Sequence, residues 1–162
     1  MDYLDIDGDY LEGGGQILRT AVSLSVITHK PIRVYNIRKK RPKDPGLKAQ
    51  HLKILEVLRD LSDADNRGFS LGSKEILFSP RKDLIENRQV KVNIGTSGAI
   101  GLLLQSILLV AAFKSQGLSL DIIGGTCGLG AIPVDYYPKV IFPILRKSGL
   151  NAQLNILRQG YY

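Results

Sequence analysis

The chain reads as two copies of one pattern offset by about 87 residues, and this repetition limits the folds it can adopt. Each copy contains, in order, a short alternating strand, a glycine-rich turn, an apolar helix, a second strand, a second helix and a closing strand segment. The matched pairs are residues 4–8 and 92–95, 16–27 and 99–113, 32–37 and 118–123, 45–61 and 133–147, and 67–78 and 153–158.

Strands that alternate with helices of this length predict an α/β (α+β) fold made of tandem βαβαββ repeats. Each repeat is expected to form a four-stranded sheet with two helices on one face. The predicted boundaries are 1–81 for the first repeat and 82–162 for the second, with the seam at residues 79–86. Units of this size are marginally stable alone, so the two copies are expected to pack on each other.

The excess positive charge is local. Residues 30–60 hold ten Lys and Arg against three Asp and Glu, which accounts for the whole net charge of +7. Such a segment favours a local anion site, although a solvated charge run remains an equal alternative. The single cysteine, Cys127, and the absence of a basic-then-apolar leader predict a cytoplasmic protein, and no stretch is apolar for long enough to span a bilayer.

Two helix starts have the composition of a phosphate site. Residues 13–15 are three glycines that open a helix, where backbone N–H groups can approach an anion closely; residues 95–98, Gly-Thr-Ser-Gly, are a second such start. If helical geometry extends through the first turn, one polar stripe carries Glu12, Gln16, Arg19 and Ser23. A glycine turn with an exposed polar face is the alternative.

The helix after the basic run carries two polar residues on its apolar stripe. Asp44 is expected to cap this helix, with Pro45 as its first residue. Gln50 and His51 then point inward beside Arg38 and Arg41, which favours a ligand site over a purely structural histidine. In the repeat, Gln105 lies within an apolar helix, where a buried amide must find a partner or a ligand.

Several of these motifs together resemble RNA 3′-terminal phosphate cyclases. The resemblance runs in order from about residue 5 to residue 162. It rests on Leu-Glu-Gly-Gly-Gly-Gln-Ile-Leu-Arg-Thr at 11–20, Asn-Ile-Arg at 36–38 with Arg41, Pro-Gly-Leu at 45–47 with Gln-His-Leu at 50–52, Leu-Gly-Ser at 71–73, and Gly-Gly-Thr at 124–126 with Pro-Val-Asp-Tyr at 133–136. Members of that family are built from repeated βαβαββ units.

The resemblance implies a ligase-class enzyme of RNA processing. The family converts an RNA 3′-phosphate end into a 2′,3′-cyclic phosphate through a histidine-AMP intermediate and an adenylated RNA end, releasing AMP and pyrophosphate. The resemblance also implies ATP and a divalent metal, Mg or Mn, as cofactors, and RNA with a 3′-phosphate as the partner. The positions that match the family's ATP and phosphate site are Glu12, Arg19, Arg38, Arg41, Gln50, His51, Gln105, Pro133 and Asp135, with Glu12 as the metal contact.

The chain also departs from the family. The family's enzymes are about twice as long, and their adenylated histidine lies in a C-terminal motif that neither His29 nor His51 matches. We therefore expect an N-terminal half that holds no catalytic nucleophile, does not self-adenylate alone, and associates with itself or with the missing half. A non-catalytic RNA-binding or ribosome-assembly relative is the alternative function, and an enolpyruvyl-transferase-like enzyme a more distant one.

Overall fold

The computed structural model describes residues 2–41, 43–81, 88–95, 98–114, 117–128 and 131–160. We call residues 2–81 the first unit and residues 88–160 the second unit. The first unit contains β1 (Leu4–Asp7), α1 (Gly15–Thr28), β2 (Ile32–Tyr35), α2 (Ala49–Ser62), β3 (Asp65–Arg67) and β4 (Ile76–Ser79). The second unit contains β5 (Arg88–Asn93), α3 (Ile100–Lys114), β6 (Leu118–Ile123), a π-helical turn (Tyr137–Ile141) and α4 (Phe142–Lys147).

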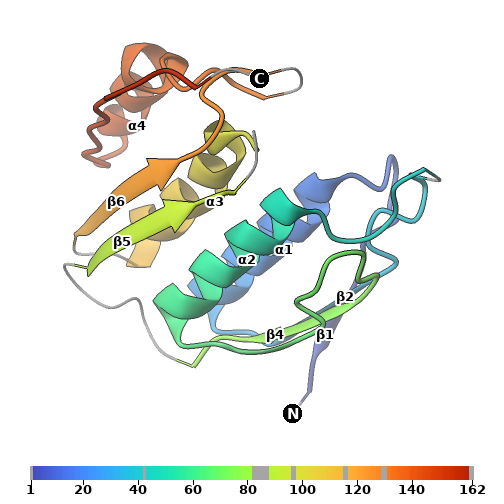
Figure 1. Cartoon of the computed structure of the whole chain (residues 1–162). Coiled ribbons are helices and arrows are strands. Elements are labelled where there is room, and N and C mark those ends of the chain that lie inside the picture. The colour runs from blue at the N-terminus through green and yellow to red at the C-terminus, as the bar shows by residue number, and fades with distance from the viewer. Residues whose placement is uncertain are drawn as a thin grey trace.

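The first unit is a four-stranded sheet covered on one face by α1 and α2 (Figure 1). The strand order is β1-β2-β4-β3; β1 runs parallel to β2, and β4 runs antiparallel to both of its neighbours. Alternation explains the two faces, because Val34 and Ile76 are fully buried under the helices while Arg33 and Glu75 form an ion pair on the open face. The βαβαββ order predicted for this unit agrees with the structure.

The second unit differs from the expected four-stranded sheet. Its described residues form only the parallel pair β5–β6, with α3 and α4 beside it, and residues 151–160 contain no strand. The prediction of a complete second sheet was therefore wrong for the described residues. In the first unit the equivalent strand, β3, is hydrogen-bonded to β4 alone. Among the described residues, 151–158 have no neighbouring strand to which they could be hydrogen-bonded in the same way, so they form no strand.

The two units pack through their helices. α1 lies between the first sheet and α3, and the Ser23 hydroxyl of α1 donates to the Ser106 carbonyl of α3 at 3.3 Å. Leu103 and Ile107 of α3 are buried, as expected of a core helix. The expectation that the copies pack on each other is confirmed. The unit boundaries stay a prediction, since residues 82–87 of the expected seam lie outside the described residues.

No helix in the described ranges is both long and apolar enough to cross a membrane.

α2 begins later than the sequence indicated. Its first residue is Ala49 and its N-cap is Lys48, so the expected start at Asp44 and Pro45 was wrong. The cause is a long-range contact: Leu47 donates its N–H to the Ser73 carbonyl and accepts from the N–H of Gly72. These two bonds keep the chain out of helical geometry where local propensity favoured a helix.

Gly46 makes this close approach feasible, and its replacement tests the contact. It has φ +78°, and a Cβ atom there would collide with the carbonyl oxygen of Gly72, whereas Gly72 has φ +76° and open space around its own Cβ position. Gly46→Ala should lower the free energy of unfolding by about 2–4 kcal/mol, and Gly72→Ala, the matched control, by about 1 kcal/mol. Urea unfolding measures both; equal losses would contradict the contact.

Candidate functional site

Three helices begin at the same end of the molecule. Gly15 at the start of α1 lies against His51 in the first turn of α2. The Ala99 N–H, just before α3, donates to Oε1 of Gln50 at 3.4 Å. Figure 1 shows these three starts together at the upper ends of α1, α2 and α3. The positive ends of three helix dipoles thus converge. Thr96 and Ser97 of the second predicted phosphate turn lie outside the described residues.

The three consecutive glycines at residues 13–15 differ in what their positions require. Gly13 has φ +60°, which disfavours any side chain. At Gly15 a Cβ would collide with Nε2 of His51. Gly14 is extended and has no atom within 4 Å of its Cβ position, so neither backbone strain nor packing requires a glycine there. It leaves open space directly before the first N–H groups of α1.

His51 is a buried neutral histidine. The residue is only 3% exposed, and its Nδ1 accepts a hydrogen bond from the backbone N–H of Lys48 at 3.2 Å. In a neutral imidazole the proton must then reside on Nε2, the nitrogen that faces Gly15. Burial, followed by the charges of Arg38, Arg19 and Lys48, lowers the pKa of His51 to about 4.

Arg19 lies one turn into α1 and is 7% exposed. Its Nη2 donates to Oε1 of Gln16 at 2.7 Å, but its buried Nε has no partner. Burial lowers the pKa of Arg19. A buried guanidinium with an unused N–H is costly unless a ligand completes it.

Arg38, in the loop after β2, is partly buried. Its backbone is left-handed, with φ 54°, which costs a residue with a Cβ roughly 1–2 kcal/mol. Its Nη2 donates to the carbonyl of Asp44 at 3.0 Å, while its Nε is buried without a partner. Burial and then the charge of Arg41 lower the pKa of Arg38.

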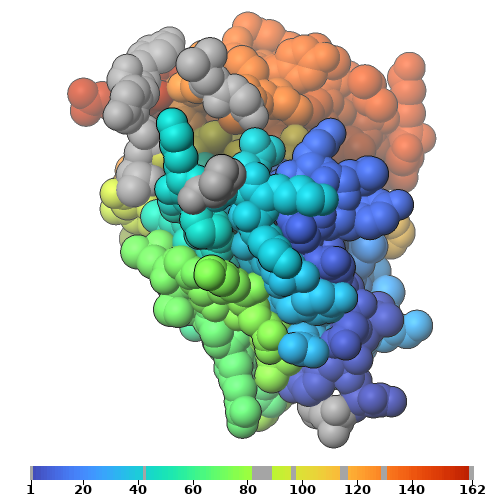
Figure 2. All heavy atoms as spheres, turned by 90° about the vertical axis from the view of Figure 1, so that its right-hand side faces the viewer, coloured from blue at the N-terminus to red at the C-terminus, as the bar shows by residue number. Residues whose placement is uncertain are grey.

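We call Arg19, Arg38, Arg41 and Lys48, whose charges act on His51 or on one another, the basic cluster. Exposed Asp44 is paired with both Arg38 and Lys48. Among the described residues no Asp or Glu is buried, so nothing inside the fold neutralises Arg19. Figure 2 shows the loops after β1 and β2, blue and cyan, as adjoining surfaces below the orange second unit. The arrangement suits an anion that takes several N–H donors at once, such as a phosphate chain.

Lys40 holds these two loops together, a role that its sequence neighbourhood did not signal. Its Nζ donates to the carbonyls of Asp9 and Leu11, both at 3.0 Å, and its N–H donates to Oδ1 of Asp9 at 3.1 Å. The glycine turn before α1 is thereby fixed against the segment that carries Arg38. The sequence indicated only the charge of Lys40; that it contacts Asp9 and Leu11 is known from the fold.

The structure does not bring every predicted residue to the basic cluster. Glu12 is exposed and precedes α1, which begins at Gly15, so the expected helical stripe through Glu12 was wrong. Asp135 accepts from Nζ of Lys139 at 3.1 Å, and neighbouring Pro133 is exposed. Within the described residues no three His, Cys, Asp or Glu side chains gather as a metal site.

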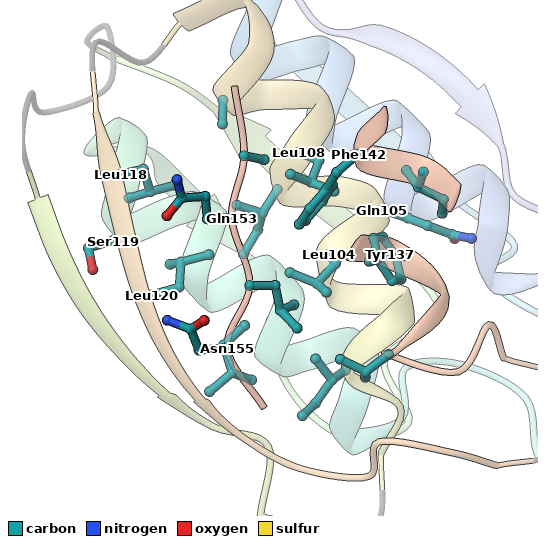
Figure 3. Close-up of a pocket in the computed structure, with 18 of the residues that line it drawn as sticks. Leu104, Gln105, Leu108, Leu118, Ser119, Leu120, Tyr137, Phe142, Gln153 and Asn155 are labelled. Carbon is teal, nitrogen blue, oxygen red and sulfur yellow. The ribbon is translucent and has the colours of Figure 1, made fainter. Parts of the chain in front are cut away.

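Gln105 and Gln50 belong to the contact between the units. Oε1 of Gln105 is buried and has no partner, and the residue lines a cavity of the second unit on the side opposite Leu118 and Leu120 (Figure 3). Gln50 is bonded to Ala99, as described above. The ligand roles of all these residues stay predictions.

The neutral state of His51 predicts a pH dependence of stability. Its pKa falls from 6.5 in the unfolded chain to about 4 in the fold, so the unfolded chain takes up the proton first as pH decreases. The free energy of unfolding should therefore drop between pH 6.5 and 4. His51→Gln, which keeps a neutral acceptor for Lys48, should remove about 2 kcal/mol of the loss between pH 7 and 4.5.

Urea unfolding at a series of pH values measures this loss. His29→Asn, at the exposed left-handed residue that ends α1, is the control and should retain the dependence of the unmodified chain. An unchanged slope in His51→Gln would contradict a buried neutral imidazole.

Comparison with known proteins assigns the family. Residues 10–162 match the family model described as RNA 3′-terminal phosphate cyclase. Proteins of that name from Thermococcus kodakarensis, Archaeoglobus fulgidus and Methanopyrus kandleri are 49%, 45% and 42% identical to the chain over 162, 159 and 162 residues. These matches cover 100%, 98% and 100% of the chain but 46%, 48% and 45% of the relatives, so the chain spans about half their length. The chain belongs to the RNA 3′-terminal phosphate cyclase family.

Proposed function

We propose that this chain provides the phosphate-binding wall for the ATP-dependent conversion of RNA 3′-phosphate ends into 2′,3′-cyclic phosphates. One observation carries the proposal: buried Arg19 and partly buried Arg38 each have a buried, partnerless Nε atom beside the converging starts of three helices. The family assignment supports the reaction class. Since the matched relatives are about twice as long, the complete reaction is proposed for the full-length protein.

The residues present fit the triphosphate of ATP. Arginine forks bind phosphate oxygens bidentately, and helix N-termini add backbone donors that favour negative charge. The open space at Gly14 lets a ligand approach the N–H groups of α1. When bound, ATP supplies the AMP group of the reaction, and these donors would hold its phosphates.

A divalent cation fits only when it is bound together with the phosphates of the nucleotide. Mg²⁺ is commonly held by one or two carboxylates together with substrate phosphates and water. Glu12, exposed on the glycine turn, is the carboxylate that we propose for this contact. Described residues offer no carboxylate cage that would hold the ion without a nucleotide.

His51 would bind rather than attack. Its Nδ1 lone pair accepts the N–H of Lys48, and its Nε2 carries the proton, so neither nitrogen offers a free lone pair to a phosphorus atom. The imidazole instead presents an N–H donor beside Gly15. This supports the prediction that the adenylated histidine lies elsewhere in the full-length protein and that this chain alone does not self-adenylate.

A double substitution separates a phosphate site from a general excess of charge. Arg38→Ala with Arg41→Ala should weaken ATP binding by about ten- to a hundredfold, because each lost charge-assisted contact is worth about 1.5–3 kcal/mol before partial compensation by neighbours. The dependence of affinity on salt should also decrease. Isothermal titration with ATP at two salt concentrations measures both quantities.

The matched control is Lys53→Ala with Arg59→Ala, which removes two positive charges from the same basic segment. These side chains are already paired, with Glu56 and Asp60. The control should bind ATP within about twofold of the unmodified chain, since these two charges are already paired with carboxylates and are not among those that act on His51. Equal losses in both double variants would refute a local site, and RNA binding without ATP binding would favour the non-catalytic alternative.

A further inference from the structure

Lys40 lies where the two loops that carry the proposed ligand contacts meet. The loop after β1 contains Glu12 and ends at the start of α1, and the loop after β2 contains Arg38 and Arg41. Figure 2 shows the two loops as adjoining surfaces. Lys40 follows Arg38 by two residues and directly precedes Arg41. A group that Lys40 binds is therefore attached to the segment that carries both arginines.

The turn before α1 has a backbone that needs support from outside. Leu11 has φ 52° and Gly13 has φ 60°, and the left-handed region is unfavourable for a residue with a Cβ atom. Leu11 is 73% exposed, so packing of its side chain does not compensate. Glu12, between them, is also exposed and makes no side-chain hydrogen bond to the described residues. The conformation of this turn therefore depends on bonds to its backbone.

Lys40 and Asp9 supply this support. Nζ of Lys40 donates to the carbonyls of Asp9 and Leu11, both at 3.0 Å, and the Lys40 N–H donates to Oδ1 of Asp9 at 3.1 Å. The same Oδ1 lies 2.8 Å from the place that a Cβ atom of Gly13 would take. The ammonium and the carboxylate thus contact both neighbours of Glu12, Leu11 and Gly13.

The ammonium of Lys40 is used within the turn. Of its three N–H donors, two go to carbonyls, and the Asp9 carboxylate is 3.9 Å away from the same Nζ. An ammonium with these neighbours has little donor capacity left for a phosphate. Its contribution to a ligand site is therefore the place of the turn, not a contact with the ligand.

The base of the turn is fixed without Lys40. Oδ1 of Asp7 accepts the N–H of Asp9 at 3.0 Å and Nδ2 of Asn36 at 3.2 Å, which joins the two loops a second time. The side chain of Lys40 is 55% exposed and outside the core. Loss of its ammonium should therefore free residues 11–13 and leave the base of the turn and the fold intact.

We propose that Lys40 is a positioning residue of the phosphate site. It fixes Glu12 relative to the loop with the arginines, so that a divalent ion on this carboxylate and the phosphates on the arginines belong to one metal–nucleotide complex. The inference rests on the proposed function and deepens it. It assigns to Lys40 the metal-dependent part of ATP affinity, because the arginines can bind phosphates without Glu12.

ATP titrations with and without magnesium test this role. Lys40→Met keeps nearly the length of the side chain and removes its N–H donors. Mg²⁺–ATP should bind about tenfold more weakly, which is the size of one charge-assisted contact. ATP in excess chelator should bind within about twofold of its affinity for the unmodified chain, since the arginine contacts remain. Titration calorimetry measures both affinities.

The matched control is Lys39→Met. It removes the neighbouring positive charge, but the exposed ammonium of Lys39 makes no hydrogen bond or ion pair to the described residues. This variant should change both affinities equally and by less than about twofold.

A restored ammonium gives a second test. Lys40→Cys is prepared together with Cys127→Ser, because Cys127 is a free, exposed thiol that would react as well. Alkylation with bromoethylamine then rebuilds a side chain that ends in an ammonium at nearly the original length. Mg²⁺–ATP affinity should be low before alkylation and return to within about twofold of that of the Cys127→Ser chain afterwards.

Amide exchange of the free chain reports on the turn itself. Gly13 donates its N–H to the Tyr10 carbonyl at 3.1 Å. In Lys40→Met this amide should exchange at least about fivefold faster, because the tip of the turn opens more often. In Lys39→Met its rate should stay unchanged. Residue-resolved exchange by nuclear magnetic resonance measures both.

The outcomes separate this inference from the proposed function. Equal weakening with and without magnesium, equal effects of Lys39→Met and Lys40→Met, or unchanged exchange at Gly13 in Lys40→Met would overturn the positioning role and leave the phosphate site standing. An unmodified chain that binds ATP no better than the double variant at Arg38 and Arg41 would refute the proposed function, and the role of Lys40 with it.

Discussion

The contact between a neutral imidazole and a glycine at the start of a helix organises the functional end of this molecule. His51 fits against α1 only because Gly15 has no side chain, and it stays uncharged because it is buried among positive groups. The contact aligns the first turns of α1 and α2, and Gln50, the preceding residue, aligns α3. One turn of α2 therefore contacts the starts of the two other helices, α1 and α3.

Much of this end could be predicted from the sequence, because its signals are local. A run of glycines before an apolar helix, and a Gln-His pair on an apolar stripe, report backbone freedom and burial within a few residues. The buried positions of Arg19 and His51 are consistent with that reading. Features set by distant partners were not predictable: α2 begins at Ala49 because of bonds to residues 72 and 73, and Lys40 acts on carbonyls about thirty residues away.

The second unit shows the same limit in another form. Its repeat pattern indicated a strand, a helix and a second strand, and the structure contains them, with the two strands paired in parallel inside the described chain. The alternation at residues 151–157 was also real, but a strand exists only when another strand takes its hydrogen bonds. Sequence periodicity reports which side chains face a core; it does not report whether the neighbouring strand belongs to the same stretch of chain.

If Arg19 and Arg38 hold their Nε–H groups for a phosphate chain, as we propose, both groups should respond when a polyphosphate binds. Proton–nitrogen correlation spectra of the arginine Nε–H groups, recorded while inorganic tripolyphosphate is added, observe those atoms directly. We expect the signals of Arg19 and Arg38 to shift together and to saturate at one equivalent, while that of Arg33, paired with Glu75 on the far face of the sheet, does not move. Shifts confined to exposed arginines, growing without saturation, would contradict it.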